Sequence, residues 1–487
     1  MATVNPEIDH LLRRAGFGVS ALDADIFKGM SPADAVDYLV NYEGRPDDVD
    51  ERIGRPDHAL VATKDLFSPD IDIEDARQRW MFRMIHTRRP LQEKMTLFWH
   101  NHFATGYTKM AIDSGTIVGA KLMAHKAGTL NGPQGQIELL RQYALGNFRN
   151  LLVEISKDPA MVIWLDGKTN TKAKPQENFG REIIELFTVG VDNYVETDVY
   201  AAARVFTGWN LRASDNYRQD DYGDLNAYQE FVFNADQHES SAKTFSFPIY
   251  PDGSKTIPAR SSTMQDGLDL ITALATHPET ARRLARKFWG FFISEINLPD
   301  PAFIEAVAAV YLQNGTEIRP VVRFIFNSPW FNDPAVRFAR YSSPAEYVVR
   351  SIREVGWQNF SVDKARSPMA AMGQLLYEPP NVAGWPQGAN WFSTGQMLAR
   401  TNFAATLASS QKQFLAATMT PDAGTPEALL AKMFDRVTPA PMDQAPQQAL
   451  MSYLTAAGPW DGKGEQLNTR ASGLARLLVG SAEYQLV

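Results

Sequence analysis

Cysteine is absent from all 487 residues of the chain. The fold therefore contains no disulfide bond, and it offers neither a thiolate metal site nor a cysteine nucleophile. Any metal ion would have to be bound by histidine and carboxylate side chains. The sequence itself identifies no metal and no cofactor.

Long apolar runs are also missing. The longest obvious one covers only residues 160–165, whereas a helix needs roughly 18 consecutive apolar residues to cross a bilayer. The N-terminus lacks the basic region and the apolar stretch of a secretory signal. We therefore expect no membrane span. We expect a cytoplasmic location for the chain as given, or a periplasmic or secreted one if a leader has been removed.

The chain has no surplus of positive charge. Lysine and arginine number 48 against 56 aspartate and glutamate residues, which gives a formal net charge of -8. Proteins that bind the phosphate backbone of nucleic acids usually carry a basic surplus. Nucleic acid is therefore not an expected partner.

Four common catalytic signatures are absent as well. The sequence contains no Gly-x-Ser-x-Gly nucleophile elbow, no Gly-x-x-x-x-Gly-Lys-Ser/Thr phosphate loop, no dinucleotide fingerprint after a strand and no His-Glu-x-x-His pair. The chemistries that depend on these motifs are disfavoured, so candidate residues must be found from other patterns.

Most segments carry the signals of helices. A hydrophobic content of 44% is enough for a large core, and helix starts are indicated at Pro32, Pro278 and Pro426. Residues 213–262 differ, since they are polar and rich in tyrosine, with the apolar alternation of strands around Phe231. The sequence predicts a mainly α, multi-helix globular fold with a small β-ribbon insertion.

Glycine and proline clusters mark the expected boundaries between parts of the chain. The predicted parts are a helical N-terminal part over residues 1–212, the β-ribbon insertion over residues 213–262, a second helical part over residues 263–437 and a C-terminal helical segment over residues 438–487.

A helix predicted from residue 178 carries four polar side chains on one face. At about 100° per residue, Asn178, Arg181, Glu182 and Glu185 fall within roughly a quarter of the circumference. Two carboxylates, an arginine and an amide are sufficient for acid–base chemistry on a hydroxylated substrate. The alternative is an ordinary solvated helix face on which these charges pair with one another.

Two histidines stand one residue apart in the segment Phe98–Phe103. On an extended backbone His100 and His102 could chelate a metal ion. In a helix that begins at Pro90 they point about 160° apart. That arrangement favours a buried, hydrogen-bonded His102 beside a more exposed His100.

Residues 378–391 are predicted to form a rigid loop with two tryptophans and two asparagine amides. Trp385 and Trp391 could stack on a sugar ring or another planar group, while Asn381 and Asn390 supply directional hydrogen bonds. The alternative is a Trp-Pro plug that closes one end of the core. Another indole, Trp209, lies in a helix predicted over residues 198–210, with Thr197 as its cap.

Four of these segments together resemble one bacterial family, the domain-of-unknown-function family 1800. They are residues 10–18, residues 98–103, residues 178–190 continuing to 207–209, and residues 379–391 with Arg400. The resemblance spans nearly the whole chain and implies a mostly helical protein. It also implies a sulfatase-like companion protein encoded nearby, but it implies no established reaction.

Polar and indole residues on four distant family motifs are more consistent with one shared pocket than with four separate surfaces. Our leading hypothesis is a carbohydrate-active enzyme, a glycoside hydrolase or lyase. Its candidate catalytic residues are Glu182, Glu185, His100 and Arg181. Its candidate substrate-binding residues are His102, Asn178, Trp209, Asn381, Trp385, Asn390 and Trp391.

Two alternatives stay open. One is a metal-dependent enzyme in which His100 or His102 joins Glu182 or Glu185 around a divalent ion. The other is a non-catalytic glycan-binding or assembly protein, in which the arginine and glutamate residues fix helix packing and the indoles fill the core.

Overall fold

The computed structural model describes residues 4–63, 65–217, 224–420, 423–456 and 458–487. Before the first strand, the described residues form twelve α-helices besides short 3-10 turns: α1 (Pro6–Ala15), α2 (Ala21–Phe27), α3 (Pro32–Val40), α4 (Ile73–His86), α5 (Pro90–His102), α6 (Tyr107–Ser114), α7 (Thr116–Ala124), α8 (Gln136–Gln142), α9 (Phe148–Lys157), α10 (Pro159–Trp164), α11 (Glu177–Glu185) and α12 (Glu196–Val205).

Four short strands follow α12, and the rest of the chain is again mainly helical. The strands are β1 (Trp209–Ala213), β2 (Gln229–Phe233), β3 (Lys243–Thr244) and β4 (Thr256–Ile257). The helices are α13 (Gln265–Thr276), α14 (Pro278–Phe288), the π-helix η5 (Trp289–Ile293), α15 (Pro301–Gln313), α16 (Ile318–Asn327), α17 (Pro329–Asn332), α18 (Pro344–Val355), α19 (Asp363–Ala371), α20 (Thr394–Ser410), α21 (Lys412–Met419), α22 (Pro426–Val437), α23 (Gln444–Thr455) and α24 (Gly464–Val479).

The chain is therefore mainly α with a small β insertion, as predicted. Antiparallel pairing joins β1 to β2, with Trp209 opposite Phe233, and β3 to β4, with Lys243 opposite Ile257. Part of the predicted insertion, residues 218–223, lies outside the described residues. Within the part of the chain that the structure describes, no helix is both long and apolar enough to span a bilayer.

The helix starts predicted at Pro32, Pro278 and Pro426 are confirmed. Each proline is the first residue of its helix, α3, α14 or α22. The side chain of the residue before it accepts a hydrogen bond from a backbone N–H of the first turn. Proline suits this position because the N–H it lacks would have no partner within the helix.

The helix predicted over residues 198–210 is wrong at both ends. It runs from Glu196 to Val205, and Trp209 belongs to β1 instead. The reason lies at Gly208, whose φ of +80° turns the chain into the strand and brings it so close to β2 that a Cβ atom would lie 2.4 Å from the Asn234 carbonyl oxygen. At the N-terminus of α12 the capping side chain is Asp198, not Thr197. The Asp198 carboxylate accepts a hydrogen bond from the backbone N–H of Val195.

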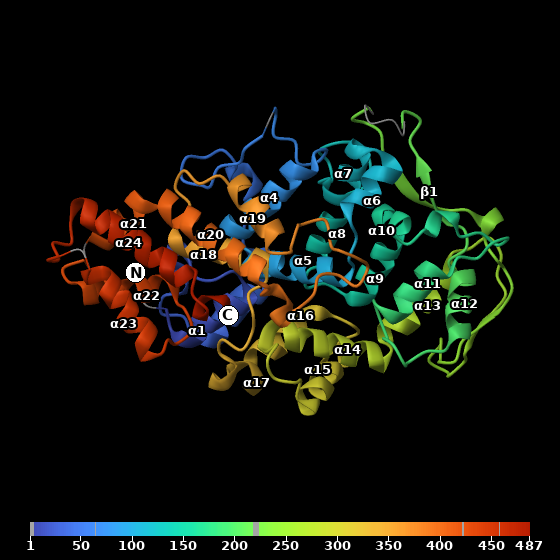
Figure 1. Cartoon of the computed structure of the whole chain (residues 1–487). Helices are drawn as coiled ribbons and strands as arrows, with labels where there is room; N and C mark the ends of the chain where they lie inside the picture. Colours follow the sequence, from blue (N-terminus) through green and yellow to red (C-terminus); the bar gives the residue numbers. More distant parts are fainter. Residues whose placement is uncertain (1–3, 64, 218–223, 421–422, 457) are drawn as a thin grey trace.

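Helix α5 lies near the centre of the molecule (Figure 1). The helices α20 to α24 lie on one side of it, and α11, α12 and the strands on the other. On the α20 to α24 side, α1 lies beside the C-terminus. The last segment also forms an antiparallel bridge there between Leu486 and Tyr341. Residues 90–100 of α5 are all buried.

A buried ionic cluster joins α5 to its neighbours α4 and α8. Glu93 accepts hydrogen bonds from Arg83 at 2.8 Å, Arg141 at 2.9 Å and the Trp80 indole at 3.0 Å. Although burial opposes ionisation, Arg141 and Arg83 hold the pKa of Glu93 below its ordinary value. The cluster therefore fixes the position of α5 relative to α4 and α8, and with it the position of the C-terminal turn of α5.

Candidate functional site

The C-terminal turn of α5 carries both histidines of the Phe98–Phe103 segment, because the helix continues to His102. The prediction of a more exposed His100 is wrong: its exposed fraction is 0%. Its ring is surrounded by three aromatic rings, with centroid distances of 5.5 Å to Trp80, 6.1 Å to Tyr377 and 5.2 Å to Trp385. Neither ring nitrogen has a hydrogen-bond partner among the described residues, and burial lowers the pKa of His100 to about 3.

His102 is buried and hydrogen-bonded on both sides of its ring. Its Nε2 lies 3.1 Å from the carbonyl oxygen of Phe187, and its Nδ1 lies 2.7 Å from Nζ of Lys287. A carbonyl oxygen can only accept, so Nε2 carries the proton and Nδ1 presents its lone pair to Lys287. Burial and the charge of Lys287 hold the pKa of His102 well below its usual range.

Lys287 is the residue with the most distinctive electrostatics near this turn. Burial, assisted by the nearby positive charge of Arg283, lowers the pKa of Lys287 to about 7. About half of an amine with such a pKa is neutral at pH 7, and a neutral lysine can act as a base or a nucleophile. Lys287 can therefore accept a proton near neutral pH, whereas an ordinary surface lysine is already protonated there.

Lys287 and His102 line a cavity of about 310 Å³. Its wall is built from the end of α5, from α14 and the π-helix η5, and from the loop that carries Trp385. The lining residues are Phe98, Asn101, His102, Arg286, Lys287, Gly290, Phe291, Glu295, Ala383, Trp385 and Gln387. Three aromatic side chains and a few charged ones on a concave surface are typical of a small-molecule or sugar-binding site.

The cavity wall includes a π-helix. The α-helical hydrogen bonding of α14 changes at Trp289, and η5 brings Gly290 and Phe291 into the lining. Single π-helical turns within α-helices are rare and are frequent at functional sites. Helix α1, which carries the first family motif, contacts η5, and its Arg14 donates a 2.7 Å hydrogen bond to the carbonyl oxygen of Val336, in the segment after α17.

The tryptophan loop docks on α5 through one asparagine. The Asn101 side chain accepts a 2.6 Å hydrogen bond from the backbone N–H of Trp385. Next to it, Gly384 has a φ of +89°, and a Cβ atom there would lie 2.3 Å from the Asn101 Oδ1. Only glycine permits this close approach, which places the Trp385 indole between the cavity and His100.

Glu295 is a second titratable group on the cavity wall. Its carboxylate accepts hydrogen bonds from the backbone N–H of Gly388 at 2.9 Å and of Tyr341 at 3.0 Å. Burial raises the pKa of Glu295, although Arg340, whose Nε lies 3.9 Å from the carboxylate, opposes the shift. The cavity thus holds a lysine whose pKa is lowered and a glutamate whose pKa is raised, the combination expected of a base and an acid.

The polar face of α11 lies apart from this cavity, and none of its four candidate residues lines it. Arg181 forms ion pairs with Glu177 at 3.2 Å and with Glu196. Asn178 donates to Asp166 at 3.3 Å. These contacts resemble those of a solvated helix face more than those of a binding pocket.

The two candidate carboxylates differ in their surroundings. Burial and the neighbouring charge of Glu185 raise the pKa of the half-buried Glu182. Glu185 accepts a hydrogen bond from the Tyr194 hydroxyl. Helix α11 reaches the cavity only through the backbone that follows it, where the carbonyl oxygens of Leu186 and Phe187 bind Arg283 and His102.

The remaining candidates lie in three different places. Trp209 is buried against Phe206 and Phe231, with both ring centroids at 5.2 Å. Trp391 is also buried, whereas Asn381 and Asn390 are exposed. Each of these two asparagine side chains bonds to the backbone of its own loop, to the Ala383 N–H and the Gln387 carbonyl oxygen. The structure therefore brings His102 and Trp385 together in the cavity, with His100 behind Trp385.

Sequence reasoning missed Asn101, Lys287 and Glu295. Lys287 follows Arg286 in a basic helix, and no local signal distinguishes this partly buried cation from its exposed neighbour. The structure also bears on metal binding: over the described ranges, no group of three or more His, Asp or Glu side chains could hold a metal ion.

One family model matches the chain. It is described as a protein of unknown function (DUF1800), and it covers residues 10–486. No curated protein and no solved structure shows a significant match. Three of the segments that carry the family resemblance, α1, the end of α5 and the Trp385 loop, contribute to the cavity or to its support.

Proposed function

The chain belongs to the DUF1800 family, and since membership brings no known reaction, we propose from the cavity that it is a carbohydrate lyase in which Lys287 is the base. The observation that carries the proposal is the contact of 2.7 Å between Lys287 Nζ and His102 Nδ1 on the cavity wall. Burial there, assisted by the charge of Arg283, lowers the pKa of Lys287 to about 7, so about half of the lysine amine is neutral at pH 7.

The reaction we propose is elimination across a glycosidic bond of an acidic sugar. The Lys287 amine takes the proton from the carbon next to the sugar carboxylate. The electron pair left behind forms a double bond to the neighbouring ring carbon as the bond between that carbon and the glycosidic oxygen breaks. Glu295, whose pKa burial raises above the ordinary glutamate value, is the group that would give a proton to the departing oxygen. Atoms and charges balance without water or a cofactor.

The rest of the cavity suits such a substrate. Trp385 offers an indole for stacking on a sugar ring. Arg286 is exposed on the lining and forms no ion pair among the described residues, so it is available for a carboxylate. The proposal keeps the carbohydrate substrate class and the role of Trp385, and it moves the acid–base pair from Glu182 and Glu185 to Lys287 and Glu295.

The test is a screen of uronate-containing polysaccharides, followed by ultraviolet absorbance of the double bond that elimination leaves beside the carboxylate. We expect absorbance to rise with the wild-type protein, to be lost with Lys287→Met and to be kept with Glu182→Gln. New reducing ends without absorbance would indicate a hydrolase and would overturn the lyase proposal. The sulfatase-like companion stays a prediction, which co-purification would test.

A further inference from the structure

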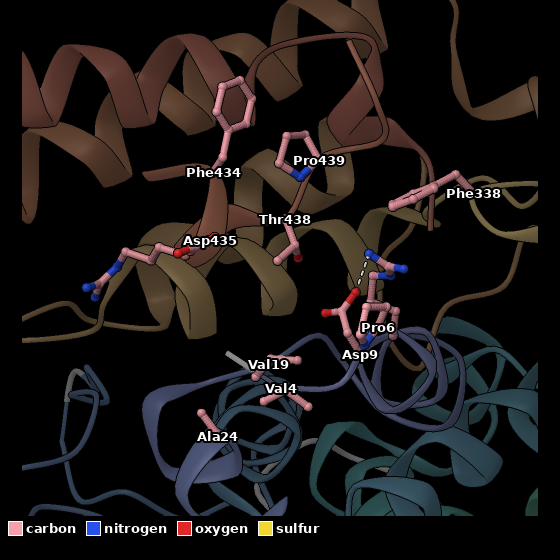
Figure 2. Close-up of a pocket in the computed structure, with 12 residues that line it drawn as sticks. Val4, Pro6, Asp9, Val19, Ala24, Phe338, Phe434, Asp435, Thr438 and Pro439 are labelled. Carbon is pink, nitrogen blue, oxygen red and sulfur yellow. Dashed lines mark ion pairs between the residues drawn. The ribbon is translucent and has the colours of Figure 1, made fainter. Parts of the chain in front are cut away.

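Two arginines on the wall of a second cavity, of about 320 Å³, have partners within the fold. This cavity lies between α1 and the segment that follows α22 (Figure 2). Arg13 pairs with Asp9 on its wall at 2.8 Å, and Arg436 donates a 2.7 Å hydrogen bond to the Glu354 carbonyl oxygen. The group whose reactivity the fold leaves free lies instead on the surface, in the loop between α7 and α8.

Two Asn-Gly sequences occur in the chain, Asn131–Gly132 and Asn314–Gly315. In such a pair the backbone nitrogen of the glycine is placed to attack the side-chain amide carbon of the asparagine and to close a five-membered succinimide ring. Glycine favours this reaction because no Cβ atom hinders the attack and its backbone adopts more conformations than that of other residues. The reaction is slowed where hydrogen bonds hold the nitrogen, so the fold decides which pair reacts.

Asn131 and Gly132 are both exposed and belong to no helix or strand. The Gly132 N–H has no hydrogen-bond partner among the described residues. Within the described chain the Asn131 side chain makes one hydrogen bond, from Nδ2 to Oδ1 of the exposed Asn226 at 3.2 Å. Since a single exposed hydrogen bond exchanges readily with water, the nucleophile and the amide that it would attack are both available.

The fold holds this pair at the tip of its loop. His125 bonds the residue on each side, because its Nε2 accepts from the Leu130 N–H at 3.2 Å and its Nδ1 donates to the Pro133 carbonyl oxygen at 2.8 Å. Gly132 has a φ of +108°, and a Cβ atom there would lie 2.7 Å from Cβ of Tyr228. The fold therefore requires a glycine directly after the asparagine.

The second pair ends helix α15 and is hydrogen-bonded. The Asn314 Nδ2 donates to the Val310 carbonyl oxygen at 2.8 Å, and the Gly315 N–H donates to the Leu312 carbonyl oxygen at 3.2 Å. The nitrogen that would attack must therefore lose a backbone hydrogen bond first. Asn314 is thus an internal reference with the same glycine neighbour.

We propose that Asn131 is a site of spontaneous deamidation in the folded chain. Hydroxide takes the proton from the Gly132 nitrogen, which forms a bond to Cγ of Asn131 as the Cγ–Nδ2 bond breaks and Nδ2 leaves as ammonia. Water then opens the succinimide at one of its two carbonyl groups and leaves aspartate or isoaspartate. Over the whole sequence one water is consumed, one ammonia is released and the hydroxide is regenerated.

The product changes the contact between this loop and the β-ribbon insertion. Nδ2 of Asn131, the donor to Asn226, is replaced by an acceptor oxygen, and a negative charge appears near Asp224, which accepts a 2.8 Å hydrogen bond from the Asn226 N–H. Isoaspartate also lengthens the backbone by one carbon between the two residues that His125 bonds. The site is independent of the proposed lyase reaction, since it shares no residue with the Lys287 cavity.

Incubation of the full-length folded chain in heavy-oxygen water at mildly alkaline pH tests the proposal. The chain is then digested in ordinary water, and mass spectrometry counts the labelled product at each pair, so that deamidation during digestion is not scored. We expect labelled product at Asn131 to form at least fivefold faster than at Asn314, because a backbone hydrogen bond must open first at Gly315. Isoaspartate among the product identifies the succinimide route, since direct hydrolysis of the amide gives aspartate alone.

The unfolded chain and one variant are the controls. In guanidinium chloride the hydrogen bond at Gly315 is lost, so the two pairs should react at similar rates. Asn131→Gln keeps an exposed amide but would need a six-membered ring, so it should remove the labelled product at this position and leave the rate at Asn314 unchanged. A folded chain in which Asn314 reacts as fast as Asn131, in which Asn131 stays intact while the unfolded chain reacts, or which yields no isoaspartate would overturn the proposal.

Discussion

Lys287 and His102, which are far apart in the sequence, meet on the cavity wall with their nitrogen atoms 2.7 Å apart. The histidine proton is held on Nε2 by the Phe187 carbonyl oxygen, so the lysine donates to Nδ1 and the pair does not compete for the same proton. This arrangement orients the amine, and its reactivity is set by its burial and by the charges around it.

The charge of Arg283 contributes to the lowered pKa of Lys287, after burial. Replacing Arg283 with Met should therefore raise the pKa of Lys287, while burial still keeps it below the ordinary value. Acetylation of the Lys287 amine as a function of pH, followed by mass spectrometry, measures this change. Arg286→Met is the matched control on the same helix and should leave the midpoint where it is; equal shifts in both variants would contradict the assignment.

The Trp385 loop contains two glycines in the left-handed region with different surroundings. At Gly384 a Cβ atom would lie 2.3 Å from Asn101 Oδ1, whereas at Gly388 none would meet an atom within 4 Å. Gly388→Ala should therefore cost only the backbone strain of roughly 1 kcal/mol. Gly384→Ala should cost clearly more and should change the Trp385 environment.

Thermal unfolding and tryptophan fluorescence of the two alanine variants measure this difference. Similar melting temperatures for both would mean that the contact between the loop and Asn101 does not hold Trp385 in place.

Glu93 stabilises the helices that hold the site. Replacing it with Gln leaves Arg83 and Arg141 buried with less compensating charge, which should cost about 3–5 kcal/mol of unfolding free energy. Glu177→Gln, at an exposed ion pair with Arg181, should change it by about 0.5 kcal/mol or less. Urea unfolding followed by circular dichroism gives both values, and a small effect at Glu93 would show that the cluster is dispensable.

The stability of the fold should depend on pH through Asp158, the capping residue of α10. Burial raises the pKa of Asp158 from 3.8 to about 7, although Gln136 and the Met161 N–H bond to its carboxyl group. The folded chain therefore keeps a proton that the unfolded chain releases at lower pH. Between those two values this group lowers stability as pH rises, by at most about 1.4 kcal/mol per pH unit.

Asp158→Asn keeps a capping side chain and removes the titration. The difference in unfolding free energy between this variant and the wild type should grow in favour of the variant from pH 4 to pH 7. Chemical unfolding at several pH values measures it, and a difference that does not change with pH would refute the raised pKa.

How far the sequence predicts the structure depends on whether a signal is local. Pro278 opens a helix because proline fits the first turn whatever surrounds it, and this prediction is confirmed. The helix predicted through Trp209 is wrong because the chain turns at Gly208 in close contact with β2. Strand β2 lies about twenty residues further along, so helical spacing does not reveal this contact.

The same limit applies to the site. Helical spacing correctly separates the directions of His100 and His102, but it does not reveal that Tyr377 and Trp385 cover His100. Lys287 gains its lowered pKa from burial against distant segments, so the sequence gives no reason to prefer it to Arg286. The sequence singles out Trp385 as a candidate because an indole in a Gly-Pro loop is informative wherever the loop packs.

The most direct test of the central claim is the pH dependence of Lys287 acetylation in the wild-type chain, with the exposed Lys364 as an internal reference. A neutral amine reacts and a protonated one does not. The account predicts half-maximal reactivity of Lys287 near pH 7. A midpoint near the ordinary lysine value of about 10.4 would mean that the amine is protonated in the cavity, and Lys287 could not then be the base.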